Sequence, residues 1–145
     1  MLAAASVAAA GPKRPALTVV ISIDQFRADY IERLSEFFQP AGTDANPGGF
    51  EYLRAKGADY YDCQYAHFPT YTGVGHATIL TGASPLTHGI VGNNWWSKAQ
   101  AKGVYCVDDD RWQVVGAGPD SKAKPMGPGN LRATTVGDEL LLATN

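Results

Sequence analysis

The order of apolar and polar residues predicts alternating strands and helices in the first half of the chain. A continuous apolar and β-branched run at 16–23 (ALTVVISI) is typical of a strand buried on both faces of a parallel sheet. Large apolar residues at helical spacing predict a helix over 25–38 and a shorter one over 50–56. Aromatic residues that alternate with polar ones over 58–66 predict a second strand.

The second half of the chain predicts a central helix, a hairpin and a further helix. Residues 76–81 are the body of the central helix, with Thr72 at a strand-to-helix junction before it. Residues 93–110 are typical of a β-hairpin. The Gly- and Pro-rich residues 116–130 predict a long irregular loop, after which the apolar spacing predicts a helix over 131–143.

This succession of elements predicts an α/β fold with a mainly parallel sheet that helices flank. Ligands of such sheets bind outside the carboxyl ends of the strands, and Asp24 and Thr72 both fall at such ends. The sequence stops two residues after the last predicted helix, with no closing strand. We therefore expect residues 16–145 to be the N-terminal part of a larger α/β domain.

Composition is that of an ordinary folded domain. The 145 residues are 45% hydrophobic and 18% charged, which is enough apolar sequence for one domain with a buried core. A formal net charge of −2 offers no basic surface for nucleic acid, and no apolar run is long enough for a transmembrane helix. We expect a monomer that binds neither nucleic acid nor membrane.

Residues 1–15, MLAAASVAAAGPKRP, are typical of the end of a secretory signal peptide. A short Ala-rich stretch leads to Ala8, Ala9 and Ala10, a small-residue pattern that suits a cleavage site. The basic segment that usually comes first is missing, which a truncated start would explain. The alternative is an Ala-rich leader without a targeting role. We expect a periplasmic or secreted protein.

The sequence contains two cysteines, Cys63 and Cys106. Their spacing matches no zinc-binding motif. An even number of cysteines in an exported protein permits a disulfide, and we expect Cys63 and Cys106 to form one. Two buried free thiols are the alternative.

Thr72 is the strongest candidate for catalysis. It lies on a Gly-rich turn that opens a helix. Such a turn presents free backbone N–H groups and the positive end of the helix dipole to an anion such as phosphate. A threonine hydroxyl needs a base or a metal to become a nucleophile. No serine-hydrolase signature accompanies Thr72, whereas Asp24 offers a carboxylate to a metal.

These candidates also have purely structural interpretations. Thr72 and Asp24 both suit the N-cap position of the helices that follow them. Asn93 can donate to a phosphate oxygen through its amide, but turn chemistry beside Gly92 is the default interpretation of an asparagine at this position.

Three further polar groups favour structural roles. His76, in the first turn of a helix, and His88, before a glycine, are more typical of hydrogen-bonded histidines than of metal ligands. The acidic run at 108–110 lacks the glycine and the distal glutamate of a calcium-binding loop, and is typical of a surface turn.

Several segments together resemble the alkaline phosphatase superfamily. They are ISIDQFRADYI, FEYLRAKGADYYDCQYAHFPT, TYTGVGHATILTGASPLTHGIVGNNWW, VYCVDDD and LRATTVGDELLLAT. The resemblance covers residues 17–145 and is closest to bacterial secreted alkaline phosphatases with a threonine nucleophile, which are related to nucleotide pyrophosphatase/phosphodiesterases. The 21 positions from Thr72 to Asn93 match the family spacing between the nucleophile and a phosphate-binding asparagine.

This resemblance implies roles for four residues. Thr72 would be the nucleophile, and Asp24 would bind one of two zinc ions together with the Thr72 oxygen. Asn93 and the backbone N–H of Gly73 would bind phosphate oxygens. The implied reaction is two in-line displacements, in which a phospho-threonine forms and water then hydrolyses it.

The length of the chain departs from the family pattern. The other zinc ligands, and the Lys-x-Arg pair that marks phosphomonoesterases, fall in the later part of such proteins. We expect a fragment that is inactive by itself, from a protein that hydrolyses small phosphate monoesters. A phosphodiesterase or nucleotide pyrophosphatase is the alternative enzyme. A non-catalytic exported α/β module is the alternative of a different class.

Overall fold

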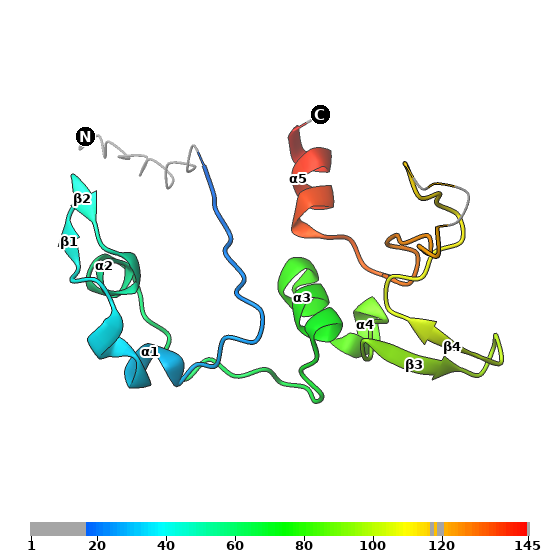
Figure 1. Cartoon of the computed structure of the whole chain (residues 1–145), viewed down its shortest axis with the longest axis horizontal. Coiled ribbons are helices and arrows are strands. Elements are labelled where there is room, and N and C mark those ends of the chain that lie inside the picture. The colour runs from blue at the N-terminus through cyan, green and yellow to red at the C-terminus, as the bar shows by residue number, and fades with distance from the viewer. Residues whose placement is uncertain (1–16, 117, 119–120, 145) are drawn as a thin grey trace, which may run out of the picture.

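Two groups of short elements make up the part of the chain that the structure, a computed structural model, describes: residues 17–116, 118 and 121–144. The irregular residues 57–71 join the two groups (Figure 1). The predicted signal remnant at 1–15 lies outside the described residues. Within the described ranges, none of the helices has the length and apolar character needed to cross a membrane.

The first group is built around aromatic side chains. Its elements are helix α1 (Tyr30–Arg33), 3₁₀-helix η1 (Ser35–Phe37), strands β1 (Gly42–Thr43) and β2 (Asn46–Pro47), and helix α2 (Gly49–Lys56). Phe50 in α2 stacks on Phe26 with ring centroids 5.5 Å apart, and its ring lies 5.0 Å from that of Phe38. These contacts hold the segment that follows Asp24 against α2.

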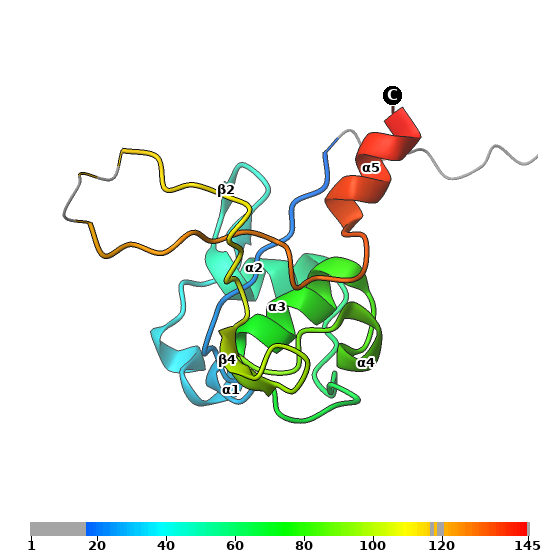
Figure 2. The ribbon, with the colours of Figure 1, turned by 90° about the vertical axis from the view of Figure 1, so that its right-hand side faces the viewer.

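The second group contains the buried apolar side chains. Its elements are helices α3 (Thr72–Thr81), α4 (Pro85–His88) and α5 (Val136–Thr144), and strands β3 (Asn94–Ser97) and β4 (Lys102–Tyr105). Val74 and Ala77 of α3, Ile90 after α4 and Val104 of β4 are buried. Helix α3 packs beside α4, and α5 touches α3 and extends away from it (Figures 1 and 2). Apolar burial thus stabilises this second group of elements around α3.

His88 fastens α4 to α3. Its side chain is fully buried, and Nδ1 accepts a hydrogen bond from the backbone N–H of Ile90 at 3.1 Å. Because that donor requires an unprotonated Nδ1, the neutral ring carries its proton on Nε2 and donates to the Thr78 hydroxyl at 3.1 Å. Burial, and secondarily the nearby His67, lower the pKa of His88. This geometry agrees with the structural interpretation of His88.

Three predicted elements are confirmed. Helix α2 covers the predicted 50–56 and begins one residue earlier. The hairpin lies within 93–110, with antiparallel pairing from Asn94 and Tyr105 to Ser97 and Lys102. The helix over 76–81 ends as predicted, at Gly82, whose left-handed φ of 64° favours glycine. That helix begins earlier than predicted, at Thr72.

The predicted parallel sheet is absent from the described residues. The sheets there are two-stranded and antiparallel, β1 with β2 and β3 with β4. Residues 17–23 belong to neither, and Leu17 and Ile21 are 78% and 75% exposed. A strand needs a neighbour to pair with its backbone, and no described segment pairs with these residues. The strand predicted over 58–66 is irregular for the same reason.

Two helices are shorter than predicted. The helix over 25–38 is reduced to α1 and η1, because Gln25 takes a left-handed φ of 58° and Leu34 leaves the helical conformation. The helix over 131–143 begins only at Val136. There Asp138 accepts from the backbone N–H of Thr135 at 2.7 Å, and Thr135 Oγ1 accepts from that of Asp138 at 3.3 Å. This reciprocal cap determines where α5 starts.

Candidate active site

Thr72 is the first residue of α3 and lines a hollow of about 260 Å³. The lining comes from the segment around Asp24, from residues just before α3 and from its first turns; it includes Ser22, Asp24, Tyr65, Tyr71, Thr72 and His76. Tyr71 holds the N-cap position of α3, with extended backbone at φ −67° and ψ 159°. Thr72 is therefore not the N-cap residue, and its hydroxyl is left to contact other groups.

The structure brings Asp24 and Thr72 together from positions far apart in the sequence. Thr72 Oγ1 lies 3.3 Å from Oδ1 and 3.5 Å from Oδ2 of Asp24, and the hydroxyl donates to the carboxylate. Both side chains are exposed to the hollow. The two side chains approach each other as expected, although the described residues contain no parallel sheet that would bring them together.

The Asp24 and Thr72 oxygens fit part of a zinc site. Two oxygen ligands at about 2.0–2.2 Å from a tetrahedral zinc lie about 3.4 Å from each other. The Thr72 and Asp24 oxygens are 3.3 Å apart. Within the described residues, no group of three or more His, Cys, Asp or Glu side chains could hold a metal. Asp24 and Thr72 would therefore supply only part of a ligand set.

Asn93 lies against the first turn of α3. Its Oδ1 accepts a hydrogen bond from the backbone N–H of Gly73 at 2.8 Å. The bond orients the amide so that Nδ2 remains as the donor for a ligand. A Cβ on Gly73 would lie 3.0 Å from Cys106 Sγ and 3.1 Å from Asn93 Oδ1. A side chain on Gly73 would therefore crowd Asn93 and Cys106.

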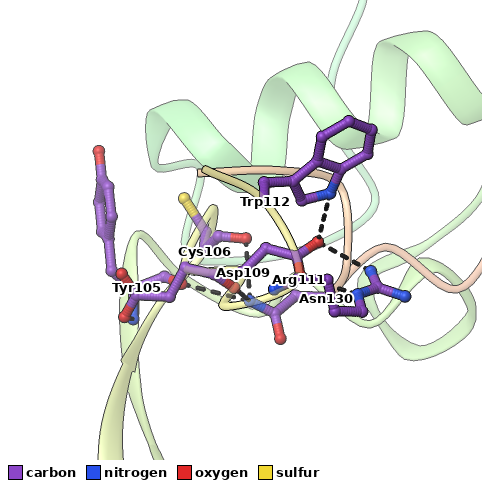
Figure 3. Close-up of polar contacts among 7 residues, drawn as sticks. Tyr105, Cys106, Asp109, Arg111, Trp112 and Asn130 are labelled. Carbon is purple, nitrogen blue, oxygen red and sulfur yellow. Dashed lines mark hydrogen bonds and ion pairs between the residues drawn. The ribbon is translucent and has the colours of Figure 1, made fainter. Parts of the chain in front are cut away.

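The turn after β4 contacts the backbone of Asn93 and holds it in place. The backbone N–H of Cys106 donates to the Asn93 carbonyl at 2.9 Å. The Asn130 amide in turn lies over the end of β4 and donates to the carbonyls of Tyr105, Cys106 and Asp108 at 3.1–3.3 Å (Figure 3). Asn130 therefore stabilises the strand end that holds Asn93. Sequence reasoning missed this contact, because only the fold brings position 130 beside position 106.

Asp109 is the centre of the same turn and is not the surface residue that the acidic run predicts. It is only 6% exposed. Arg111 donates to it twice at 2.8 Å, and Trp112 Nε1 donates at 3.1 Å (Figure 3). The Arg111 hydrogen bonds hold the pKa of the Asp109 carboxyl far below its usual range. Because its oxygens already accept these bonds, Asp109 has a structural role and is a poor candidate for a calcium ligand.

The predicted disulfide between Cys63 and Cys106 is wrong for this structure, because both thiols are free. Cys63 is exposed in the irregular segment that leads to α3. Cys106 is half-buried, with its sulfur packed toward Gly73. Burial raises the pKa of the Cys106 thiol, which disfavours the reactive thiolate and slows its reactions.

His76 lies one helical turn after Thr72. Its Nδ1 is 2.8 Å from the Thr72 carbonyl oxygen, and its Nε2 is 3.3 Å from the Ser22 hydroxyl. The prediction of a hydrogen-bonded histidine agrees with these contacts. The partner, Ser22, was not foreseen, since nothing local in the sequence connects positions 22 and 76.

Comparison with known proteins identifies similar sequences. Residues 18–128 match the model of the family described as type I phosphodiesterase / nucleotide pyrophosphatase. Over 132 residues, 91% of this chain, the sequence is 39% identical to alkaline phosphatase PafA of Elizabethkingia meningoseptica and 41% identical to alkaline phosphatase PhoV of Synechococcus elongatus. It is 35% identical over 133 residues, 92% of this chain, to a protein of Myroides odoratus named calcium-transporting ATPase.

The matched regions are a small part of each relative. They cover 23%, 22% and 23% of the lengths of these three proteins. The chain therefore spans less than a quarter of the length of the curated relatives it matches.

Proposed function

The chain belongs to the type I phosphodiesterase / nucleotide pyrophosphatase family, and from that premise we propose that it carries the nucleophile of a metal-dependent phosphate monoester hydrolase. The observation that supports this most is the Thr72 hydroxyl, which lies at the start of α3 and 3.3 Å from the Asp24 carboxylate. Two of the three relatives described are named alkaline phosphatases, which favours monoesters as the substrate class.

In the proposed reaction, Thr72 Oγ attacks phosphorus and displaces the alcohol of the ester. Asn93 Nδ2 donates to a non-bridging phosphate oxygen, and its own orientation is held by Gly73. The N-terminus of α3 adds a favourable field for the negative charge. Water then hydrolyses the phospho-threonine, which releases inorganic phosphate and restores the hydroxyl. Each half of the reaction is an in-line displacement.

The proposed cofactor is zinc, two ions in the complete protein. Asp24 and the Thr72 oxygen would hold one of them, and other residues of the complete protein would supply the further ligands. Bound zinc lowers the pKa of a hydroxyl and offsets charge on attacking and leaving oxygens. Since these residues supply only part of a ligand set, we expect the 145-residue chain alone to be inactive. The proposed compartment is the periplasm or the exterior of the cell.

The first test replaces the nucleophile in the complete protein. Thr72→Ala is expected to lower kcat for p-nitrophenyl phosphate at least about 1000-fold with zinc present, because it removes the oxygen that would attack phosphorus. Thr81→Ala, at the opposite end of α3, is the control, and its kcat should stay close to that of the unmodified protein. Mass spectrometry after an acid quench should find phosphate on the peptide that contains Thr72. Normal turnover by Thr72→Ala would refute the assignment.

A phosphodiesterase is the second candidate, since the family is described by that activity. The two enzymes share the nucleophile, so the discriminating measurement is the ratio of kcat/KM for p-nitrophenyl phosphate to that for bis-p-nitrophenyl phosphate. A ratio above one supports the monoesterase, and a ratio below one supports the diesterase. Turnover of neither ester with zinc present would favour the non-catalytic module.

A further inference from the structure

We propose that His76 is a positioning residue that sets the separation between Asp24 and Thr72 by clamping the Ser22 segment to α3. The inference rests on the proposed function in one respect, namely that Thr72 is the nucleophile. It concerns residues of this chain only and assigns a role to two side chains, Ser22 and His76, that the proposed chemistry leaves unused.

The hydrogen bonds of His76 define how the ring sits. The Thr72 carbonyl oxygen is an acceptor only, so Nδ1, at 2.8 Å from it, carries the proton. In the neutral ring, Nε2 is then a lone-pair acceptor. The Ser22 hydroxyl, 3.3 Å away, donates to it. His76 therefore accepts from the segment that carries Asp24 and donates to the residue that carries the hydroxyl.

The spacing of the contacts supports a clamp. Ser22 and Asp24 are two residues apart, and both line the hollow in front of α3. Two residues of chain span up to about 7 Å. Thr72 and His76 are four residues apart on a helix, which is a rise of about 6 Å. The two lengths match, and two parallel contacts form: Ser22 with His76, and Asp24 with Thr72.

The Ser22–His76 and Asp24–Thr72 contacts matter because few other contacts hold residues 17–24 to α3. Within the described residues, no backbone hydrogen bond joins 17–24 to α3. The Asp24 contact is itself long, at 3.3 Å and 3.5 Å. Losing the Ser22 contact would therefore let the Asp24 carboxylate move relative to the Thr72 hydroxyl.

The same geometry argues against His76 as the general base. A base must lie within hydrogen-bond reach of the proton it removes. Both ring nitrogens instead have other partners, the Thr72 carbonyl and the Ser22 hydroxyl. The ring acts on the Thr72 hydroxyl only through the position of the backbone and of Asp24.

The test is a double-mutant cycle in the complete protein with Ser22→Ala and His76→Asn. The Asn amide retains a donor near the Nδ1 position but is too short to reach Ser22, so both changes remove the same contact. Each is expected to lower kcat for p-nitrophenyl phosphate about 10–100-fold, with KM nearly unchanged. The kcat of the double variant should be no lower than that of the less active single variant, because both substitutions remove the same contact. The amount of zinc retained after dialysis, measured by elemental analysis, should also be lower in each single variant than in the unmodified protein, with no further decrease in the double variant.

Thr81→Ala is the matched control. Thr81 Oγ1 donates to the Ala77 carbonyl at 2.6 Å and accepts from the Ala83 N–H at 3.2 Å, so the variant removes side-chain hydrogen bonds from the other end of α3. It should retain kcat and zinc. Losses that add in the double variant, or that follow melting temperature or KM instead of kcat, would overturn the positioning role.

The outcome separates this inference from the proposed function. If Thr72→Ala is inactive while Ser22→Ala and His76→Asn are fully active and retain zinc, only the clamp is refuted. If Thr72→Ala retains full activity, the proposed nucleophile itself is refuted.

Discussion

At the residue scale, Gly73 shows why a residue without a side chain follows the proposed nucleophile. The backbone N–H of Gly73 donates to the Asn93 amide oxygen at 2.8 Å, and a methyl group on Gly73 would lie 3.0 Å from Cys106 Sγ and 3.1 Å from Asn93 Oδ1, which is a tight contact. Gly73 therefore fixes the position of the Asn93 amide, which we propose binds phosphate, relative to the proposed nucleophile Thr72. Close approach, and not a positive φ, is what requires glycine here.

Gly73→Ala is expected to destabilise the protein and to disturb the site. The new Cβ would meet Cys106 Sγ at 3.0 Å and Asn93 Oδ1 at 3.1 Å, so one of them must move. Overpacking of this kind costs about 1–3 kcal/mol, and a displaced Asn93 should lower kcat/KM by about 10–100-fold. Urea unfolding and phosphatase kinetics measure the two effects.

Gly75→Ala is the matched stability control for this prediction. A Cβ at Gly75 would meet only the Tyr65 hydroxyl, at an ordinary 3.7 Å. Replacing a helical glycine by alanine should raise stability by about 0.5–1 kcal/mol. Equal changes in stability at the two glycines would contradict the steric argument.

At the element scale, the packing of α4 on α3 depends on one neutral histidine. His88 bridges the Ile90 backbone and the Thr78 hydroxyl in a fully buried position. A second proton would place a charge in that position and would remove the acceptor that the Ile90 N–H needs. The helix pair that supports Thr72 should therefore be sensitive to acid.

The expected pH dependence follows from the lowered pKa of His88. The unfolded chain takes up this proton near the ordinary pKa of about 6.5, before the folded protein does. Stability is thus complete above that pH and falls as pH decreases toward the folded pKa. Melting temperatures between pH 7.5 and pH 5 should show a steeper decline for the unmodified protein than for His88→Gln. Identical slopes would show that His88 does not titrate on unfolding.

Over the whole molecule, residues far apart in sequence decide what the site contains. Asp24 reaches Thr72, Ser22 reaches His76, and Asn130 reaches the end of β4 that supports Asn93. The two cysteines, in contrast, are not brought together, since the chain path leaves Cys63 exposed and places Cys106 against Gly73.

The free cysteines predict a thiol titration. In the complete, unreduced protein, an aromatic disulfide reagent should label both thiols, Cys63 quickly and Cys106 slowly because burial raises the pKa of its thiol. Cys63→Ser should remove the fast phase and Cys106→Ser the slow one. A protein whose thiols react only after reduction would contain the disulfide that this structure lacks.

Local patterns in the sequence determined the elements whose stability is local. Helix α2, the hairpin and the end of α3 at Gly82 follow from apolar spacing, turn residues and a left-handed glycine. The apolar run at 16–23 predicted a strand, but a strand also depends on a neighbour, and the described residues supply none. The start of α5 was misplaced because its cap at Thr135 and Asp138 determines it more sharply than the apolar spacing does.

For the site, the sequence by itself determined the candidate residues, and only the tertiary structure decided their contacts. The Gly-rich turn at Thr72 and its spacing to Asn93 can be read from the sequence. The orientation of Asn93 toward Gly73, the Ser22–His76 contact and the separation of Cys63 from Cys106 cannot. Hydrophobic periodicity and turn chemistry act over a few neighbouring residues, whereas these contacts depend on the path of the chain between positions that are tens of residues apart.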